Sequence, residues 1–155
     1  MSRRGTATVV LIVLALTPVS LAARDPVPTE PVARVQHHLR EIAPLVEHFE
    51  GVLARDCPRF ARRAEWRDWF DDEVDRVALL VAHLDQAWVE AKQTSDDEIR
   101  RLAKGPRKHI DRARALVEKL QACADRNGES FSPPSVWRRV EREASRRQAD
   151  IALPR

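Results

Sequence analysis

Apolar side chains beyond Glu30 recur at steps of three and four residues, the spacing that places them on one face of an α-helix. Four such stretches follow one another, and few glycines interrupt them. No stretch shows the sustained apolar-polar alternation that is typical of a β-strand. The pattern therefore predicts an all-α fold.

The first two predicted helices cover residues 31–54 and about 58–92. Pro44 lies inside the first pattern and is expected to kink that helix. Residues 56–58 end it, because a residue that precedes proline avoids the helical region. The second helix carries a heptad stripe, which suits a seam between nearly parallel or antiparallel helices. The stripe consists of Trp66, Phe70, Glu73, Val77, Leu80, Leu84, Ala87 and Ala91.

The third predicted helix begins at Ser95, which forms a capping box with Glu98. Gly and Pro at residues 105–106 interrupt its apolar stripe, but the stripe keeps its phase, which indicates a kink within one helix. Asn-Gly at residues 127–128 ends it. The fourth helix is short and begins after Ser132, a good capping residue followed by proline.

Short connections make consecutive helices antiparallel neighbours. We therefore expect an up-down-up-down four-helix bundle, with three long helices and a short fourth, that forms one domain over residues 32–155. In this topology Cys57 and Cys123 lie at the same pole. A structural disulfide is the favoured interpretation in an oxidising compartment. The alternative is a redox-active or metal-binding thiol pair, but the chain has no C-x-x-C motif.

The first residues differ in character from the rest. A basic start, an uninterrupted apolar stretch over residues 9–16 and a small-x-small pattern at residues 20–22 predict a signal peptide over residues 1–22, with cleavage one residue later as second choice. Residues 23–31 then form an extended tether. The alternative is an uncleaved membrane anchor, but the apolar run is short for about 30 Å of hydrocarbon. We expect a periplasmic or secreted protein.

Cleavage changes the charge and the candidate chemistry. It removes two arginines from a formal net charge of +3, which leaves +1, so net charge does not indicate a nucleic-acid binder. It also removes the only methionine, so His/Met ligation of haem is excluded. The C-x-x-C-H motif of c-type haem is absent.

Basic residues form two clusters that could meet anionic lipid, lipopolysaccharide or nucleic acid. Acidic residues are interleaved with them, so a solvated, salt-bridged surface is the simpler interpretation. The first cluster surrounds the kink and contains Arg100, Arg101, Lys104, Arg107, Lys108 and Arg112. The second lies on the fourth helix and contains Arg138, Arg139, Arg142, Arg146 and Arg147.

The histidines suggest two hypothetical metal sites. His37, Glu41 and His48 share one side of the first helix and could bind a divalent metal, although a solvated polar face explains them equally well. His38 and His109 are expected at similar heights in the bundle, beside the kink. They could hold a metal or a haem through paired imidazoles. The alternative is one hydrogen-bonded core histidine, with His38 turned to solvent.

Glu73 is the one carboxylate in the stripe of the second helix. A buried acid can be catalytic, but we expect this one to pair with Arg112 or Arg114 on the facing helix. No nucleophile elbow, phosphate-cradling glycine loop or catalytic triad is recognisable. The sequence therefore predicts neither an enzyme nor a bound cofactor.

The stretches RVQHHLREIAPLVEHFEGVLARD and RDWFDDEVDRVALLVAHL, within residues 34–84, resemble the RAQPRD family of exported proteins of integrative conjugative elements. The shared features are a signal peptide, a Pro-Leu pair in the first helix and an aromatic-acidic start to the heptad run. The chain departs from the family in lacking the Arg-Ala-Gln-Pro-Arg-Asp run and in carrying two further helices and a cysteine pair. The resemblance implies a role in a conjugation apparatus and no catalytic residues.

Together these features predict a small exported helical protein with a structural or binding role and a protein partner in the cell envelope. The first alternative is a metal- or haem-binding bundle that uses the histidines. The second is contact between the arginine clusters and an anionic membrane or nucleic acid.

Overall fold

The structure is a computed structural model that describes residues 28–154. The expected signal peptide and the first part of the expected tether lie outside the described residues. Residues 28–154 form helices and contain no strand. None of the described helices is long and apolar enough to cross a membrane.

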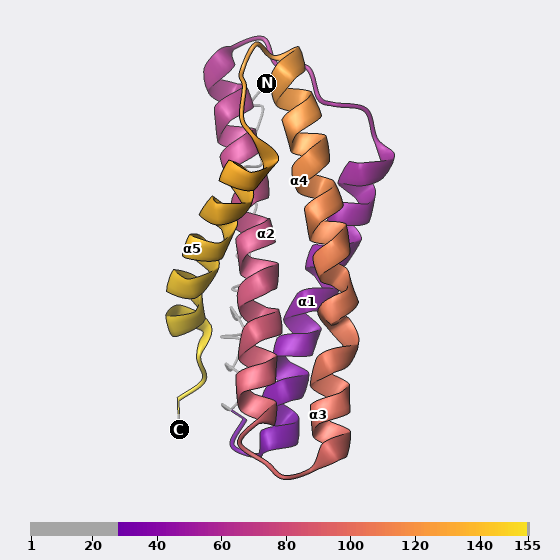
Figure 1. Cartoon of the computed structure of the whole chain (residues 1–155), viewed down its shortest axis with the longest axis vertical. Coiled ribbons are helices and arrows are strands. Elements are labelled where there is room, and N and C mark those ends of the chain that lie inside the picture. Colours follow the sequence, from indigo (N-terminus) through magenta and orange to yellow (C-terminus); the bar gives the residue numbers. More distant parts are fainter. Residues whose placement is uncertain (1–27, 155) are drawn as a thin grey trace, which may run out of the picture.

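The helices stand in four columns, which confirms the expected all-α bundle (Figure 1). Along the chain, α1 rises, α2 descends, α3 and α4 rise as one column, and α5 descends beside α2 (Figure 1). A single turn of 3₁₀ helix, η1, joins α3 to α4. The bounds are Pro31–Ala54 for α1, Arg63–Ala91 for α2, Asp97–Lys104 for α3, Gly105–Lys108 for η1, His109–Arg126 for α4 and Pro133–Ile151 for α5.

The helix ends match the sequence pattern at some positions and differ at others. The bounds of α1 are those predicted, and the helix continues through Pro44. The predicted capping residue of α3 is wrong by one position, since Asp96 and not Ser95 caps it. The Asp96 carboxylate accepts hydrogen bonds from the N–H groups of Glu98, at 2.8 Å, and Ile99, at 3.4 Å. A carboxylate at this position also interacts favourably with the positive end of the helix dipole.

The interruption at Gly105 is a change of helix type within one column. Pro106 has no N–H to donate, and η1 spans this position with the tighter hydrogen bonding of a 3₁₀ turn. The column ends at Asn127, as predicted. Gly128 takes a positive φ of 73°, and the N–H of Glu129 reaches back to the carbonyl of Ala124 at 3.0 Å. Only glycine adopts this backbone conformation without steric cost.

The fourth column, α5, packs chiefly on α2 and contacts α4 much less. The two helices run parallel, because Arg139 of α5 binds Asp71 near the start of α2, whereas Gln148 binds Gln86 further along it. Sequential adjacency predicts α4 as the main neighbour of α5, so this expectation needs correction. The helix buries a single stripe, which consists of Val136, Val140 and Ala144.

The disulfide between Cys57 and Cys123 is confirmed. It connects the α1–α2 loop to the last turn of α4, with a Cα–Cα distance of 5.4 Å and a sequence separation of 66. Aromatic rings pack below it at the same pole. Phe70 stacks on Phe131 with a centroid distance of 4.8 Å, and Trp66 lies against Phe70. The disulfide therefore closes the upper end of the bundle.

Replacing both cysteines with serine (Cys57→Ser and Cys123→Ser together) should lower the free energy of unfolding by about 4 kcal/mol, since the cross-link restricts a long loop in the unfolded chain. Urea denaturation of the variant and the oxidised wild type measures this difference. Two free thiols in wild-type protein taken from its native compartment, detected by mass spectrometry after alkylation, would contradict the assignment.

Candidate functional site

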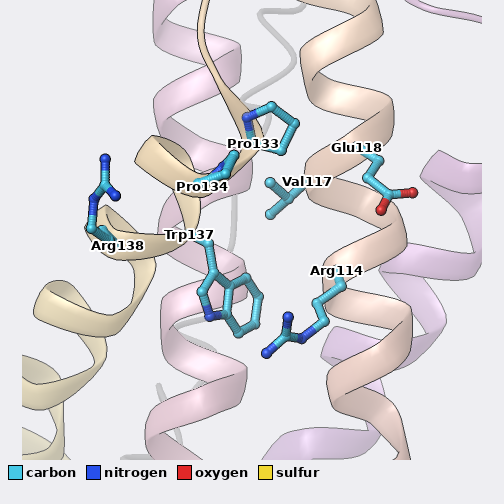
Figure 2. A pocket seen from close by; sticks show the side chains of 7 residues that line it. All are labelled: Arg114, Val117, Glu118, Pro133, Pro134, Trp137 and Arg138. Carbon is cyan, nitrogen blue, oxygen red and sulfur yellow. The ribbon is translucent and has the colours of Figure 1, made fainter.

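A groove of about 350 Å³ opens between α4 and α5 (Figure 2). Its apolar lining comes from Val117 of α4 and from Pro133, Pro134 and Trp137 of α5. The charged residues at its edges are Arg114, Glu118 and Arg138. Because α5 rests mainly on α2, the space beside α4 is left unfilled by the bundle itself.

The start of α5 positions the aromatic side of this groove. The carbonyl of Ser132 accepts hydrogen bonds from the N–H groups of Ser135, at 2.9 Å, and Val136, at 3.2 Å. Prolines suit the intervening first turn, which has no intrahelical partners for its N–H groups. Trp137 follows one turn later, and its Nε1–H donates to the Glu141 carboxylate at 2.8 Å. This bond orients the indole ring.

Arg114 and Trp137 face one another across the groove (Figure 2). The guanidinium carbon of Arg114 lies 4.7 Å from the ring centroid, a cation–π distance. Glu118 and Arg138 lie at the outer edges (Figure 2). Within residues 28–154, none of these three charged groups forms an ion pair. The groove thus presents an aromatic ring beside uncommitted charges.

Other members of the second basic cluster are committed to ion pairs. Arg139 binds Asp71, Arg147 binds Asp75 at 2.8 Å, and Arg146 binds Glu143 at 2.9 Å. In the described part of the chain Arg138 and Arg142 have no such partner. The sequence identified this cluster but could not separate its paired members from its unpaired ones.

His38 lies in the core, and its partner is His83 of α2, a residue not among the predicted site residues. The two Nδ1 atoms are 3.1 Å apart. His83 follows Leu80 by three positions and precedes Ala87 by four, so the periodicity of α2 could have placed it on the buried face. The expectation that His38 turns to solvent or joins His109 is therefore not met.

His109 begins α4, where burial and the neighbouring Lys108 lower its pKa, and Glu50 of α1 acts in the opposite direction. Arg112, three residues beyond His109, binds Glu50 of α1 at 3.1 Å, and Glu50 lies twelve positions beyond His38 in that helix. The two imidazoles therefore lie at different heights in the bundle.

The other proposed ligands are also dispersed. No group of three or more His, Cys, Asp or Glu side chains within residues 28–154 is arranged to hold a metal. His48 contacts Glu73 across the α1–α2 seam, with its Nε2 2.8 Å and 3.0 Å from the two carboxylate oxygens. His37 and Glu41 are therefore not joined by His48 in a common site.

Glu73 is buried and paired, but its partners differ from those expected. Besides His48, it accepts a hydrogen bond from Arg76 of its own helix at 2.9 Å. Arg112 instead binds Glu50 at 3.1 Å, and Arg114 stacks on Trp137. The expectation of Arg112 or Arg114 as its partner is therefore wrong.

A buried ion pair lies at the other end of the α1–α2 seam. Arg34 donates to Glu90 from Nε at 2.8 Å and from Nη2 at 3.0 Å. Its guanidinium also donates to the carbonyls of Leu153 and Pro154, each at 2.8 Å, and to that of Pro28 at 3.2 Å. These bonds hold the pKa of Glu90 below its usual range. One arginine thus connects α2 to both ends of the described region.

Burial governs the charge state of the histidine pair. It lowers the pKa of His38 to about 4, and the neighbouring His83 contributes in the same direction. Burial also lowers the pKa of His83. Both imidazoles are therefore neutral near pH 7, and one Nδ1–H donates to the other Nδ1. In the described part of the chain, Nε2 of His38 has no hydrogen-bond partner.

Comparisons with known proteins return no relative. No family model matches the chain, and neither a curated protein nor a solved structure matches it. The likeness to the RAQPRD family remains a prediction.

The histidine pair should make stability depend on pH. A histidine in the unfolded chain has a pKa near 6.5, whereas burial lowers the pKa of His38 in the folded protein to about 4. The unfolded chain therefore binds more protons in this range, and the free energy of unfolding falls as pH decreases from about 6.5 towards about 4. We expect a loss of about 2 kcal/mol between pH 7 and pH 5 from His38 alone. Arg34, His37 and Glu90 also act on His38, and Glu41 and His37 on His83.

Urea denaturation at both pH values measures this dependence. The double substitution of glutamine for His38 and His83 should flatten it. His37→Gln, which changes a neighbouring histidine outside the buried pair, should retain most of it. Equal pH dependence in the wild type and the double variant would rule out the pair as the cause.

Proposed function

We propose that the protein is a non-catalytic binding module of the cell envelope and that it binds a protein partner in the α4–α5 groove. The observation that carries this proposal is the stacking of Arg114 on Trp137 beside an apolar floor. Trp and Arg are the residues most enriched among the energetic centres of protein interfaces. The charged groups at the groove's edge form no ion pair within residues 28–154.

The groove also favours a particular kind of segment. About 350 Å³ accommodates a few side chains rather than a folded domain. Val117 and the two prolines offer apolar contact, while Arg114 and Arg138 outnumber Glu118 at the edge. We therefore infer an extended segment with an aromatic or aliphatic residue next to an acidic one, since the acid would neutralise an unpaired guanidinium.

The envelope location rests on two observations of different kinds. The N-terminal pattern over residues 1–22 is that of a signal peptide. The Cys57–Cys123 disulfide is compatible with an oxidising compartment, where such bonds persist. The role in a conjugation apparatus that the family resemblance implies would place the partner in the same compartment.

The alternative of a metal- or haem-binding bundle has less support. The rings of His37 and His83 both lie close to that of His38, but His38 and His83 already contact one another, and no group of three or more side chains within residues 28–154 is arranged to hold a metal. A stable metal site usually needs three or four protein ligands. The α4–α5 groove, by contrast, combines an apolar lining with an aromatic ring and unpaired charges.

A displayed library of short peptides, selected on the mature oxidised protein, tests the proposal. Selected peptides should share an acidic residue adjacent to an aromatic or aliphatic one. Trp137→Ala and Arg114→Ala should each weaken their binding at least tenfold in isothermal titration calorimetry, as expected for residues at the centre of an interface. Arg126→Ala, an exposed arginine outside the groove, is the matched control and should not change the affinity.

Thermal unfolding monitored by circular dichroism verifies that each variant remains folded. Peptides that bind Trp137→Ala as tightly as the wild type would exclude the groove as the binding site. A selection that yields no peptide above background would count against the proposal as a whole.

A further inference from the structure

A second aromatic pocket lies at the opposite end of the bundle, where α2 ends and α3 begins. Trp88 is half-buried and packs against a small core cluster at this end, which consists of Val35, Ala91, Ile99 and Ala103. The pocket is open to solvent and has a volume of about 650 Å³. We call it the Trp88 pocket, and its lining residues are Trp88, Lys92, Asp97, Arg100, Arg101 and Lys104.

Two ammonium groups converge on the ring of Trp88. Nζ of Lys92 lies 5.2 Å from the ring centroid, and Nζ of Lys104 lies 5.1 Å from it. Within residues 28–154, neither lysine forms an ion pair. Two like charges on one indole ring repel each other, and a bound anion would offset this repulsion.

The rest of the lining increases the positive charge. Asp97 is the one acid of the pocket, and it lies 3.5 Å from Arg100. Arg101 has no ion-pair partner in the described part of the chain, and its Nε donates only to the carbonyl of Asp97 at 3.4 Å. Nε of Arg100 is buried without a hydrogen-bond partner there. Four cations thus surround a single carboxylate.

We propose that the Trp88 pocket binds a phosphate-bearing ligand, either a free phosphate compound or the headgroup of an anionic phospholipid. A phosphate group offers several acceptor oxygens and up to two negative charges, which matches a set of two ammonium and two guanidinium groups. An acidic peptide fits this pocket less well, because Trp88 is its one apolar lining residue. This site is separate from the α4–α5 groove, and neither proposal depends on the other.

Two probes distinguish the sources of the phosphate. Isothermal titration calorimetry of the mature oxidised protein with inorganic pyrophosphate measures binding of a free compound. Co-sedimentation with vesicles of phosphatidylglycerol and phosphatidylcholine, against vesicles of phosphatidylcholine alone, measures binding of a headgroup. Binding to either probe should weaken as sodium chloride is added, because exposed charges are screened.

The variant Lys92→Gln/Lys104→Gln should weaken binding of the active probe at least tenfold, since it removes two charge-assisted contacts. The matched control is Arg126→Gln/Arg142→Gln, which removes the same charge from exposed residues that line neither pocket. The control should bind as the wild type does. Arg101→Gln, a single change of an exposed side chain, provides a second variant if the double lysine variant proves unstable.

Binding of pyrophosphate alone identifies a free phosphate compound, and binding of phosphatidylglycerol vesicles alone identifies a headgroup. Absence of binding to both probes overturns the proposal. So does a control variant that weakens binding as much as the lysine variant, since that result would reflect overall charge. Loss of pyrophosphate binding leaves peptide binding at the α4–α5 groove unaffected, which separates this test from that of the proposed function.

Discussion

Three polar pairs, two of them buried and one half-buried, fix the register of α1 against α2, and the rest of the bundle depends on that register. From one end of the seam to the other, Arg34 binds Glu90, His38 contacts His83, and His48 binds Glu73. Between the last two pairs the position on α1 rises by ten and the position on α2 falls by ten, as antiparallel helices require. Any shift by one turn would leave several buried polar groups without partners, and each such group costs about 1–3 kcal/mol.

Helix α2 contacts each of the other α-helices, most extensively α1 and α5. It contacts α1 through the polar pairs and α5 through the Asp71 and Asp75 carboxylates on its outer side. The disulfide secures one end of the assembly, and the Arg34 bonds to the carbonyls of Leu153 and Pro154 secure the other. Because α5 is held to α2 along its length and at its end, α4 needs no close contact with it. The α4–α5 groove results from the packing of α5 on α2 rather than on α4.

Sequence periodicity was sufficient for features that depend on local rules. It predicted α1, the end of α4 at Asn127 and the common pole of Cys57 and Cys123, because backbone conformation and topology decide these. It did not predict which polar side chains meet. Whether Asp96 or Ser95 caps α3 depends on a single acceptor, and whether His38 meets His83 or His109 depends on the relative heights of the helices that carry them. Pairwise contacts between helices depend on register, which composition and spacing do not contain.

The two tryptophan pockets illustrate how similar residues can favour different ligands. Each places cations on an indole ring, but Trp137 has Val117 and two prolines beside it, whereas Trp88 has only charged neighbours in its pocket. Apolar area provides much of the affinity for a peptide side chain, while unpaired cations provide most of it for a phosphate group. The surroundings of each ring, rather than the cation–π contact itself, therefore determine the ligand class. The basic clusters in the sequence do not predict a specific ligand for the same reason. Only the folded chain shows which of their members form internal ion pairs and which line open pockets.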